Sequence, residues 1–422
     1  MKIKHVCVSD IDGGAARAAY RLHLGLTQAG QDSTMLVGKK HSNDPRVVRF
    51  DPRPDAVSRF KRRARRAWLE QALRYHTGRA EQGFDLFSDD RSRFGAEVAE
   101  QCRDAEIINL HWVAGFVDWR EFFSAIPKRA GVVWTLHDMG PFTGGCHYDN
   151  GCGRFREQCG QCPLLKKRND HDFSLQVWTR KKTALEALDP ARVRFAADSH
   201  WLADEARRSS LFGRFDVRAI HYGLDAEAFA PRDRAHAREV LGIPAEKKVL
   251  LFGAYSVNDR RKGYPELVEA LAKLQTPDVV LVTIGAGKIP AQASHPTIHL
   301  GSIGNDRVLS MIYSAADVFV LPSLQEAFGQ TALESIACGT PVAAFDAGGI
   351  PDIVRPEQTG LLARVGDSTG LAVAIDRLLG APALRAEMSR VGREIVLREF
   401  TLATQAENYV RLYESLLSGK SL

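Results

Sequence analysis

Residues 322–339 read Pro-Ser-Leu-Gln-Glu-Ala-Phe-Gly-Gln-Thr-Ala-Leu-Glu-Ser-Ile-Ala-Cys-Gly, and this stretch decides the fold. Its glutamates, Glu326 and Glu334, stand eight residues apart after a predicted strand. The second lies in a predicted helix that opens near Gly329 and ends at Gly339, a favoured residue just past a helix end. The turn into the helix leaves free backbone N–H groups at a positive dipole end, which suits an anion. Carboxylates beside it can accept hydrogen bonds from hydroxyls, so the stretch suits a sugar nucleotide.

Apolar strands alternate with helical stretches along the rest of the chain, which predicts an α/β fold with parallel sheets. A first series of strands is predicted at 2–9, 34–37, 107–110, 132–136 and 193–197. A second series begins after residue 244, at 248–253, 279–285, 297–300, 317–321 and 341–345. The restart predicts two doubly wound domains, at 1–220 and 221–399.

The bulk properties fit a two-domain globular protein. The chain has 422 residues, 45% of them hydrophobic and 26% charged, with a formal net charge of +6. No apolar run approaches the roughly 18–20 residues that cross a bilayer. The first residues resemble a strand and not a signal peptide, so a cytoplasmic protein is expected.

The stretch around the two glutamates strongly resembles the E-x7-E region of glycosyltransferase family 4, a family of retaining GT-B enzymes. Earlier in the chain, further stretches resemble the family and occur in the family's order: 221–225, 252–254, 261–263 and 283–287. Within the family, the chain resembles a subgroup found in bacterial polysaccharide assembly, on the evidence of residues 109–112, 134–138 and 141–148. The resemblance covers nearly the whole chain. It implies two Rossmann-like domains facing across a cleft, with a helix at 400–418 crossing back to the first domain.

The resemblance also assigns roles on the donor side. Glu334 would accept hydrogen bonds from ribose hydroxyls, and Glu326 would face the transferred sugar. The backbone N–H groups of Phe328, Gly329 and Gln330 would bind phosphate or sugar oxygens.

Cations are expected at the diphosphate, whose negative charge grows as it leaves. Lys262 matches the family lysine before a glycine. The family arginine that usually follows the strand glycine is missing here, because Gly253 is followed by Ala-Tyr-Ser. Arg261 is the expected substitute, with Arg260 as the second choice. A solvated basic turn is the alternative interpretation.

The first strand ends in Asp10-Ile-Asp12-Gly13-Gly14. The Asp-x-Asp pattern occurs in metal-dependent glycosyltransferases, but its place here favours a loop, so no catalytic metal is expected. The two glycines predict a tight strand-to-helix turn. They would also let the backbone approach the donor phosphate or the acceptor.

Histidines end two strands of the first domain. His137 resembles the family histidine beside the transferred sugar, and Asp138 is expected to orient it. His111 and Trp112 are expected to line the acceptor pocket, although a packing role for Trp112 is an equal alternative. A lone histidine is more often structural than functional.

Four of the seven cysteines, Cys146, Cys152, Cys159 and Cys162, crowd into seventeen residues. Four closely spaced thiolates suit a structural zinc ion. Disulfides and a plain structural loop are the alternatives, and a reducing cytoplasm disfavours disulfides.

Residues 59–69 form a basic run in which six of the eleven residues are Lys or Arg. If the run is helical, Phe60, Ala64, Ala67 and Trp68 share a face. It resembles an interfacial helix that contacts anionic lipid. A solvated helix packed on the domain and a nucleic-acid patch are the alternatives.

The sequence therefore predicts a metal-independent, retaining glycosyltransferase that moves a sugar from a nucleotide donor to a hydroxyl of a lipid-linked bacterial glycan. The enzyme would be peripheral on the inner face of the cytoplasmic membrane. Two alternatives stay open: a GT-B sugar-nucleotide epimerase and a zinc-bearing nucleic-acid-binding protein. The second leaves Glu326 and Glu334 unexplained, so no nucleic-acid partner is expected.

Overall fold

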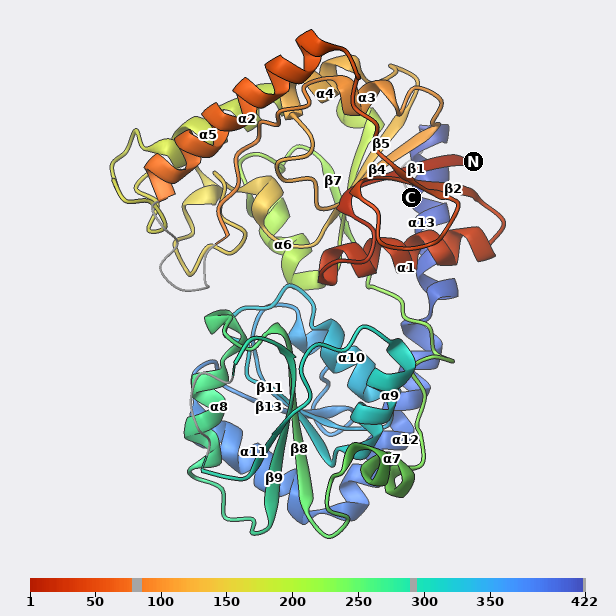
Figure 1. The fold of residues 1–422 in the computed structure, drawn as a ribbon, viewed down its shortest axis with the longest axis vertical. Helices are drawn as coiled ribbons and strands as arrows, with labels where there is room; N and C mark the ends of the chain where they lie inside the picture. Colours follow the sequence, from red (N-terminus) through yellow and green to blue (C-terminus); the bar gives the residue numbers. More distant parts are fainter. Residues whose placement is uncertain (78–85, 289–293, 420–422) are drawn as a thin grey trace. The chain divides into compact units, whose positions relative to one another are not determined.

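The computed structural model describes residues 1–77, 86–288 and 294–419 (Figure 1). These residues form two compact units. The first contains 1–77, 86–221 and 405–419, and the second contains the described part of 222–404. Each unit is built around one parallel sheet, as the alternation of strands and helices predicts.

The sheet of the first unit has seven strands in the order β3-β2-β1-β4-β5-β6-β7. Their bounds are β1 Lys2–Ser9, β2 Asp32–Lys39, β3 Val47–Arg49, β4 Ile107–Leu110, β5 Gly131–Leu136, β6 Val193–Ala197 and β7 Asp216–Ala219. The helices are α1 Gly14–Gln28, α2 Ala56–Thr77, α3 Glu97–Glu100, α4 Trp119–Ala125, α5 Phe173–Glu186 and α6 His200–Arg208.

The sheet of the second unit has six strands in the order β10-β9-β8-β11-β12-β13. Their bounds are β8 Lys248–Ser256, β9 Val279–Ala286, β10 Thr297–His299, β11 Val318–Leu321, β12 Val342–Phe345 and β13 Gly360–Ala363. The helices are α7 Arg234–Leu241, α8 Tyr264–Leu271, α9 Asp306–Ala315, α10 Gln330–Ala337, α11 Ser368–Gly380 and α12 Pro382–Glu399, and α13 Leu402–Ser418 leaves this unit.

All ten predicted strands are present, and the three that the sequence did not predict are β3, β7 and β13. Each of the three lies at the edge of its sheet. Edge strands are short and need no long apolar run, because they pair on one side only. The interior strands β4, β5, β6, β11 and β12 are buried along their whole length.

Each sheet reverses its strand order next to the first strand of its unit. In the first unit β1 pairs with both β2 and β4, and in the second β8 pairs with both β9 and β11. Ligands of open α/β sheets bind beyond the carboxyl ends of the strands at such a switch point. The residues after β1, β4, β8 and β11 are therefore the first to consider for a site.

Helix α13 starts in the second unit and joins the core of the first. Its buried residues Tyr409, Leu412, Tyr413 and Leu416 share one apolar cluster with residues of β1, α1, β4 and β5. The Tyr413 hydroxyl accepts a hydrogen bond of 2.8 Å from the Asn109 side chain on β4. The first unit is therefore completed by the last helix of the chain.

The predicted helix at 59–69 is present as the middle of α2, and its two sides differ. Phe60 and Trp68 are 73% and 54% exposed, and the Arg91 guanidinium lies 4.4 Å over the Trp68 ring, so the predicted apolar face is only partly covered by the unit. Arg62 and Arg65 lie on the opposite side, where they form ion pairs with Glu97 and with Asp118 and Glu121. The basic run is therefore not one uniform solvent-facing patch. None of the helices in the described residues is both long enough and apolar enough to cross a bilayer.

Candidate functional site

A loop that follows β11 presents Glu326 in the second unit. The turn at Gly263 packs directly on this loop: Gly263 has φ +73°, and a Cβ there would lie 1.7 Å from the Pro322 carbonyl oxygen. Only glycine fits this approach. The Gly349 N–H donates to the Glu326 carbonyl at 2.9 Å from the other side. Glu326 is thus held between two glycine-containing turns.

Lys262 and Arg261 surround the carboxylate of Glu326. The Lys262 Nζ lies 2.5 Å from the Glu326 Oε2, and an Arg261 guanidinium nitrogen lies 3.6 Å from the same oxygen. Burial alone would raise the pKa of Glu326, but the two cations outweigh it and hold that pKa below its usual value. Burial lowers the pKa of Lys262, and Glu326 opposes the shift. The group is an ionised cluster with two cations against one central carboxylate.

The two neighbouring arginines differ in their contacts. Arg261 donates to the Gln325 carbonyl at 2.9 Å and pairs with Asp259 at 3.2 Å. Arg260 instead forms a bidentate ion pair with Glu266 on α8. Of the two arginines that the sequence offered, Arg261 is the one whose charge acts on Glu326.

Glu334 is a buried residue of α10, whose start is set by Gly329 at φ +100°. The Tyr313 hydroxyl donates to its Oε2 at 3.0 Å. Phe328, just before the helix, packs edge-on against Tyr222 with ring centroids 4.9 Å apart. A carboxylate fixed in this way by a phenol is positioned to accept further hydrogen bonds from hydroxyl groups.

The acceptor-side residues predicted from the sequence meet in one cavity of the first unit. Its volume is about 410 Å³. It is lined by Ser88, Asp89, His111, Trp112, Val113, Ala114, Trp119, Trp134, His137, Asp138, Gly140, Pro141, His147 and Lys181. Aromatic walls with a few polar groups are typical of a site for a sugar or other small molecule.

Asp138 organises one side of this cavity. Its Oδ2 accepts hydrogen bonds from Trp112 Nε1 at 3.1 Å and lies 2.7 Å from His147 Nδ1. Its Oδ1 accepts from the Gly140 N–H at 2.8 Å. These contacts hold Trp112 and His147 in place, so Trp112 both packs and carries a fixed polar contact. The orientation of His137 by Asp138 stays a prediction.

Three histidines form a chain that leads from the wall of the cavity, at His137 and His111, to the buried His5. His137 Nε2 lies 3.1 Å from His111 Nδ1, and His111 Nε2 lies 2.8 Å from His5 Nδ1. Burial lowers the pKa of all three, that of His137 to about 4, although Asp138 opposes the shift for His137. Neutral imidazoles result at ordinary pH, each able to donate from one nitrogen and accept at the other.

Among the lining residues that escaped the sequence analysis, Ser88 and Lys181 carry polar contacts. Ser88 Oγ lies 2.7 Å from His147 Nε2. The buried Lys181 Nζ donates to the carbonyls of Gly140 and Thr143, at 2.7 and 3.1 Å. Neither residue belongs to a recognisable motif, and both lie far along the chain from the strand ends that they join.

Asp10 and Gly13 follow β1 at the switch point of the first unit. Asp10 accepts hydrogen bonds from the backbone of His41 and Ser42, at 2.9 and 2.8 Å, so it is a loop residue as predicted. Gly13 has φ +94° and precedes Gly14, the first residue of α1. A Cβ at Gly13 would meet no protein atom within 4 Å. Its conformation requires glycine, and its surroundings leave space for a ligand.

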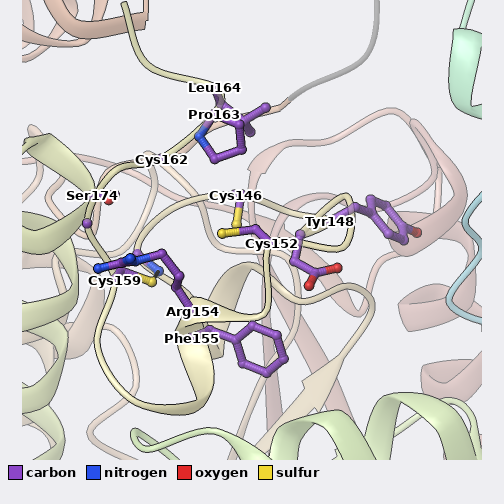
Figure 2. Close-up of a pocket in the computed structure, with 13 residues that line it drawn as sticks. Cys146, Tyr148, Cys152, Arg154, Phe155, Cys159, Cys162, Pro163, Leu164 and Ser174 are labelled. Atoms are coloured by element: carbon purple, nitrogen blue, oxygen red, sulfur yellow. Dashed lines mark hydrogen bonds between the residues drawn. The ribbon is translucent and has the colours of Figure 1, made fainter. Parts of the chain in front are cut away.

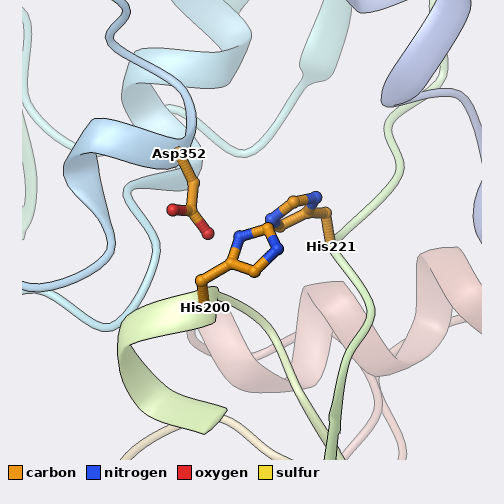
Figure 3. A group of neighbouring side chains, drawn as sticks. All are labelled: His200, His221 and Asp352. Carbon is orange, nitrogen blue, oxygen red and sulfur yellow. The ribbon is translucent and has the colours of Figure 1, made fainter. Parts of the chain in front are cut away.

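The four clustered cysteines line a second cavity of the first unit (Figure 2). Elsewhere in this unit, the rings of His200 and His221 pack edge-on with centroids 5.1 Å apart (Figure 3). Asp352, also drawn in Figure 3, ends the short helix η5 (Ile350–Asp352) of the second unit.

The family model for "glycosyl transferases group 1" matches residues 233–395, within the second unit. A D-inositol 3-phosphate glycosyltransferase of Saccharomonospora viridis is 37% identical over 42% of this chain and 45% of its own length. An alpha-maltose-1-phosphate synthase of Mycobacterium tuberculosis is 30% identical over 60% of this chain and 70% of its own length. The chain thus spans less than half of the first relative.

Solved structures are similar over almost the whole chain. A sucrose-phosphate synthase of Thermosynechococcus elongatus has a TM-score of 0.67 at 25% identity and covers 99% of both chains. HepE of Anabaena, solved with UDP-glucose, has a TM-score of 0.68 at 17% identity and covers 98% of this chain. The predicted α/β fold, with the two Rossmann-like domains of the GT-B class, is confirmed.

Proposed function

Because the chain belongs to the family of glycosyl transferases group 1, we propose that it moves a sugar from a nucleotide-sugar donor to a hydroxyl of a glycan. The observation that carries the proposal is the cluster of Lys262, Arg261 and Glu326 at the end of β11, with Glu334 eight residues further on. The cluster supplies cations for a diphosphate and carboxylates for hydroxyls.

The cations replace a metal ion in this proposal. Lys262 and Arg261 neutralise the negative charge that develops on the leaving diphosphate, which is the task that a divalent ion performs in other transferases. Lys262 is held in a partly buried, preorganised position by Glu326. A buried charge acts more strongly on a ligand than a solvated one.

Retention at the anomeric carbon is part of the proposal, and the same contacts support it. Glu326 is paired with Lys262 and also accepts a hydrogen bond from Ser323 at 3.3 Å. A carboxylate neutralised in this way is a weak nucleophile. We therefore favour a front-face substitution, in which the leaving diphosphate and the incoming hydroxyl stay on one side of the sugar.

The aromatic cavity of the first unit is proposed to hold the acceptor. His137 would lie beside the transferred sugar, with His111 behind it, and Trp112 would form a wall. Neutral imidazoles can accept the hydrogen of an acceptor hydroxyl, and indole faces pack well against sugar rings. Gly13 would let the backbone of the first unit approach a ligand closely.

A lipid-linked acceptor in polysaccharide assembly is proposed on account of α2. Its exposed side combines Phe60 and Trp68 with the exposed cations Arg59, Lys61 and Arg63, and with Arg66, which pairs with Glu70 on the same helix. Such a surface suits an anionic membrane, where each cation contributes on the order of 1 kcal/mol. Arg62 and Arg65 are left out of this surface, because both are engaged with the unit itself.

A screen of nucleotide sugars by thermal shift tests the donor, since a ligand that binds only the folded state raises its apparent stability. The best donor is then incubated alone and with candidate acceptors. These include lipid-linked glycans and phosphorylated compounds such as the inositol 3-phosphate in the name of one relative. Transfer to an acceptor, undiminished without added magnesium or manganese, is expected. A free isomerised sugar from the donor alone would instead indicate an epimerase.

A further inference from the structure

A long loop between β5 and α5 carries the four clustered cysteines. Its only regular element between the cysteines is the single turn η2, Arg154–Arg156. Irregular segments of this length are uncommon in compact domains unless something ties them down. All four cysteines line one cavity of about 360 Å³, together with side chains such as Phe155 and Leu164 (Figure 2).

We propose that Cys146, Cys152, Cys159 and Cys162 bind one structural zinc ion. Four thiolate ligands fill the tetrahedral shell that zinc prefers and leave no position for a catalytic water. The inference goes beyond the proposed function and does not depend on it, because the ion would organise the loop and take no part in sugar transfer.

The backbone around the cavity is shaped for sulfur ligands. The Gly144 N–H donates to the Cys159 Sγ at 3.1 Å. A Cβ at Gly144 would lie 2.7 Å from the Cβ of Cys159, so glycine is needed for this approach. A backbone N–H that donates to a sulfur fixes the orientation of that ligand.

A buried cation, Lys181, contacts the start of the loop that carries the cysteines. The buried Lys181 Nζ donates to the carbonyl of Thr143, three residues before Cys146, at 3.1 Å. Four thiolates and one Zn²⁺ carry a net charge of −2, which is costly to bury without a counter-charge. Lys181 therefore offsets part of this charge, while its hydrogen bonds to Gly140 and Thr143 fix the start of the same loop.

The four sulfur atoms line the cavity, but they lie further apart than the ligands of one tetrahedral metal ion. Within the described residues, no three of them lie within 4.8 Å of one another. Cys152 is exposed on a turn, whereas Cys159 and Cys162 are buried. Cysteine side chains move between staggered rotamers at little cost, and binding of the metal would close the set around itself.

Zinc at this position would also stabilise the wall of the aromatic cavity. His147 follows Cys146 directly and contacts both Asp138 and Ser88. The Cys146 backbone is further tied to Thr143, whose hydroxyl donates to the Cys146 carbonyl at 2.6 Å. A zinc ion bound to Cys146 would therefore restrain His147, which contacts Asp138.

The test is the metal content of the full chain purified without added metal, measured by inductively coupled plasma mass spectrometry. About one zinc per chain is expected. Titration with an organomercurial in the presence of a chromogenic chelator should release that zinc as the cluster thiols react, and this measurement needs no variant.

The matched variants are Cys162→Ser and Cys102→Ser, since both remove a buried thiol and Cys102 lies outside the cluster. Cys162→Ser should lose most of the zinc, whereas Cys102→Ser should retain it. A folded wild-type chain with less than a tenth of a zinc per molecule would overturn the proposal. Disulfides among the four cysteines in the intact mass, or equal zinc in both variants, would overturn it as well.

Discussion

The candidate sites of the two units differ in the charge state of their titratable groups. In the second unit, Glu326 is ionised between Lys262 and Arg261, and the cluster is held by charge. In the first unit, the cavity is backed by histidines that burial keeps neutral. A leaving diphosphate needs fixed charge, whereas a hydroxyl acceptor needs groups that accept and donate hydrogen bonds. The contrast matches the two halves of a proposed transfer reaction.

Loss of the central cation of the second unit should have the largest effect. Lys262→Ala should lower kcat by roughly 10²–10³-fold, the usual cost of removing one preorganised stabiliser of transition-state charge. Initial-rate kinetics with the best donor would measure it. Arg260→Ala is the control, because Arg260 pairs with Glu266 and should cost far less. Similar losses in both variants would remove the distinction between the neighbouring cations.

The neutral histidines make the first unit sensitive to acid. An unfolded histidine binds a proton near pH 6.5, but folded His137 does so only near pH 4, so stability falls as the pH drops through this window. His137 alone should cost about 2 kcal/mol by pH 5 and about 3 kcal/mol below pH 4. His5 and His111 shift in the same direction. The pKa of Glu326 is lowered, so its contribution is lost only at still lower pH.

All six tryptophans lie in residues 1–221, so tryptophan fluorescence reports on the first unit alone. Urea unfolding followed in this way should show decreasing stability from pH 7.5 to pH 4.5. His137→Gln, which cannot titrate, should reduce the slope, while His5 and His111 keep part of it. A profile that is level over this range would show that the histidines are not held neutral.

Glu334 should contribute to donor affinity more than to turnover. Glu334→Ala removes hydrogen bonds to a charged acceptor, which should weaken nucleotide binding by about 1.5 kcal/mol, roughly tenfold. Isothermal titration with the nucleotide would measure the change. Tyr313→Phe removes only the phenol that holds Glu334 and should weaken binding less. Unchanged affinity in Glu334→Ala would exclude Glu334 from the donor site.

The smallest effect is expected on the surface of α2. Arg63→Gln should weaken binding to anionic vesicles by on the order of 1 kcal/mol. Arg62→Gln is the matched control, because Arg62 pairs with Glu97 and should affect folding stability instead. Co-sedimentation at two salt concentrations would measure both. Equal binding to neutral vesicles would argue against a role for the basic side.

The sequence predicted the second unit more completely than the first, for a physical reason. Glu326, Gly329 and Glu334 lie in one stretch of nine residues, and Lys262 directly precedes Gly263. Residues that are close together in the sequence form these features, so a short motif is enough to predict them. In the first unit, Ser88 and Lys181 reach His147 and Gly140 from distant segments, and only tertiary folding brings them together. The edge strands were missed because pairing on one side requires no long apolar run.

The packing of α13 sets the order in which a growing chain can mature. The first 221 residues leave the ribosome with the apolar surface of Ile3, Leu26 and Ile107 uncovered, since its partners Tyr409 and Leu416 are not yet made. The second unit, 183 residues long from 222 to 404, is translated in between. At 5–20 residues per second this leaves an interval of about ten to forty seconds. A nascent chain stalled before residue 405 should therefore recruit chaperones, and releasing the stall should free it.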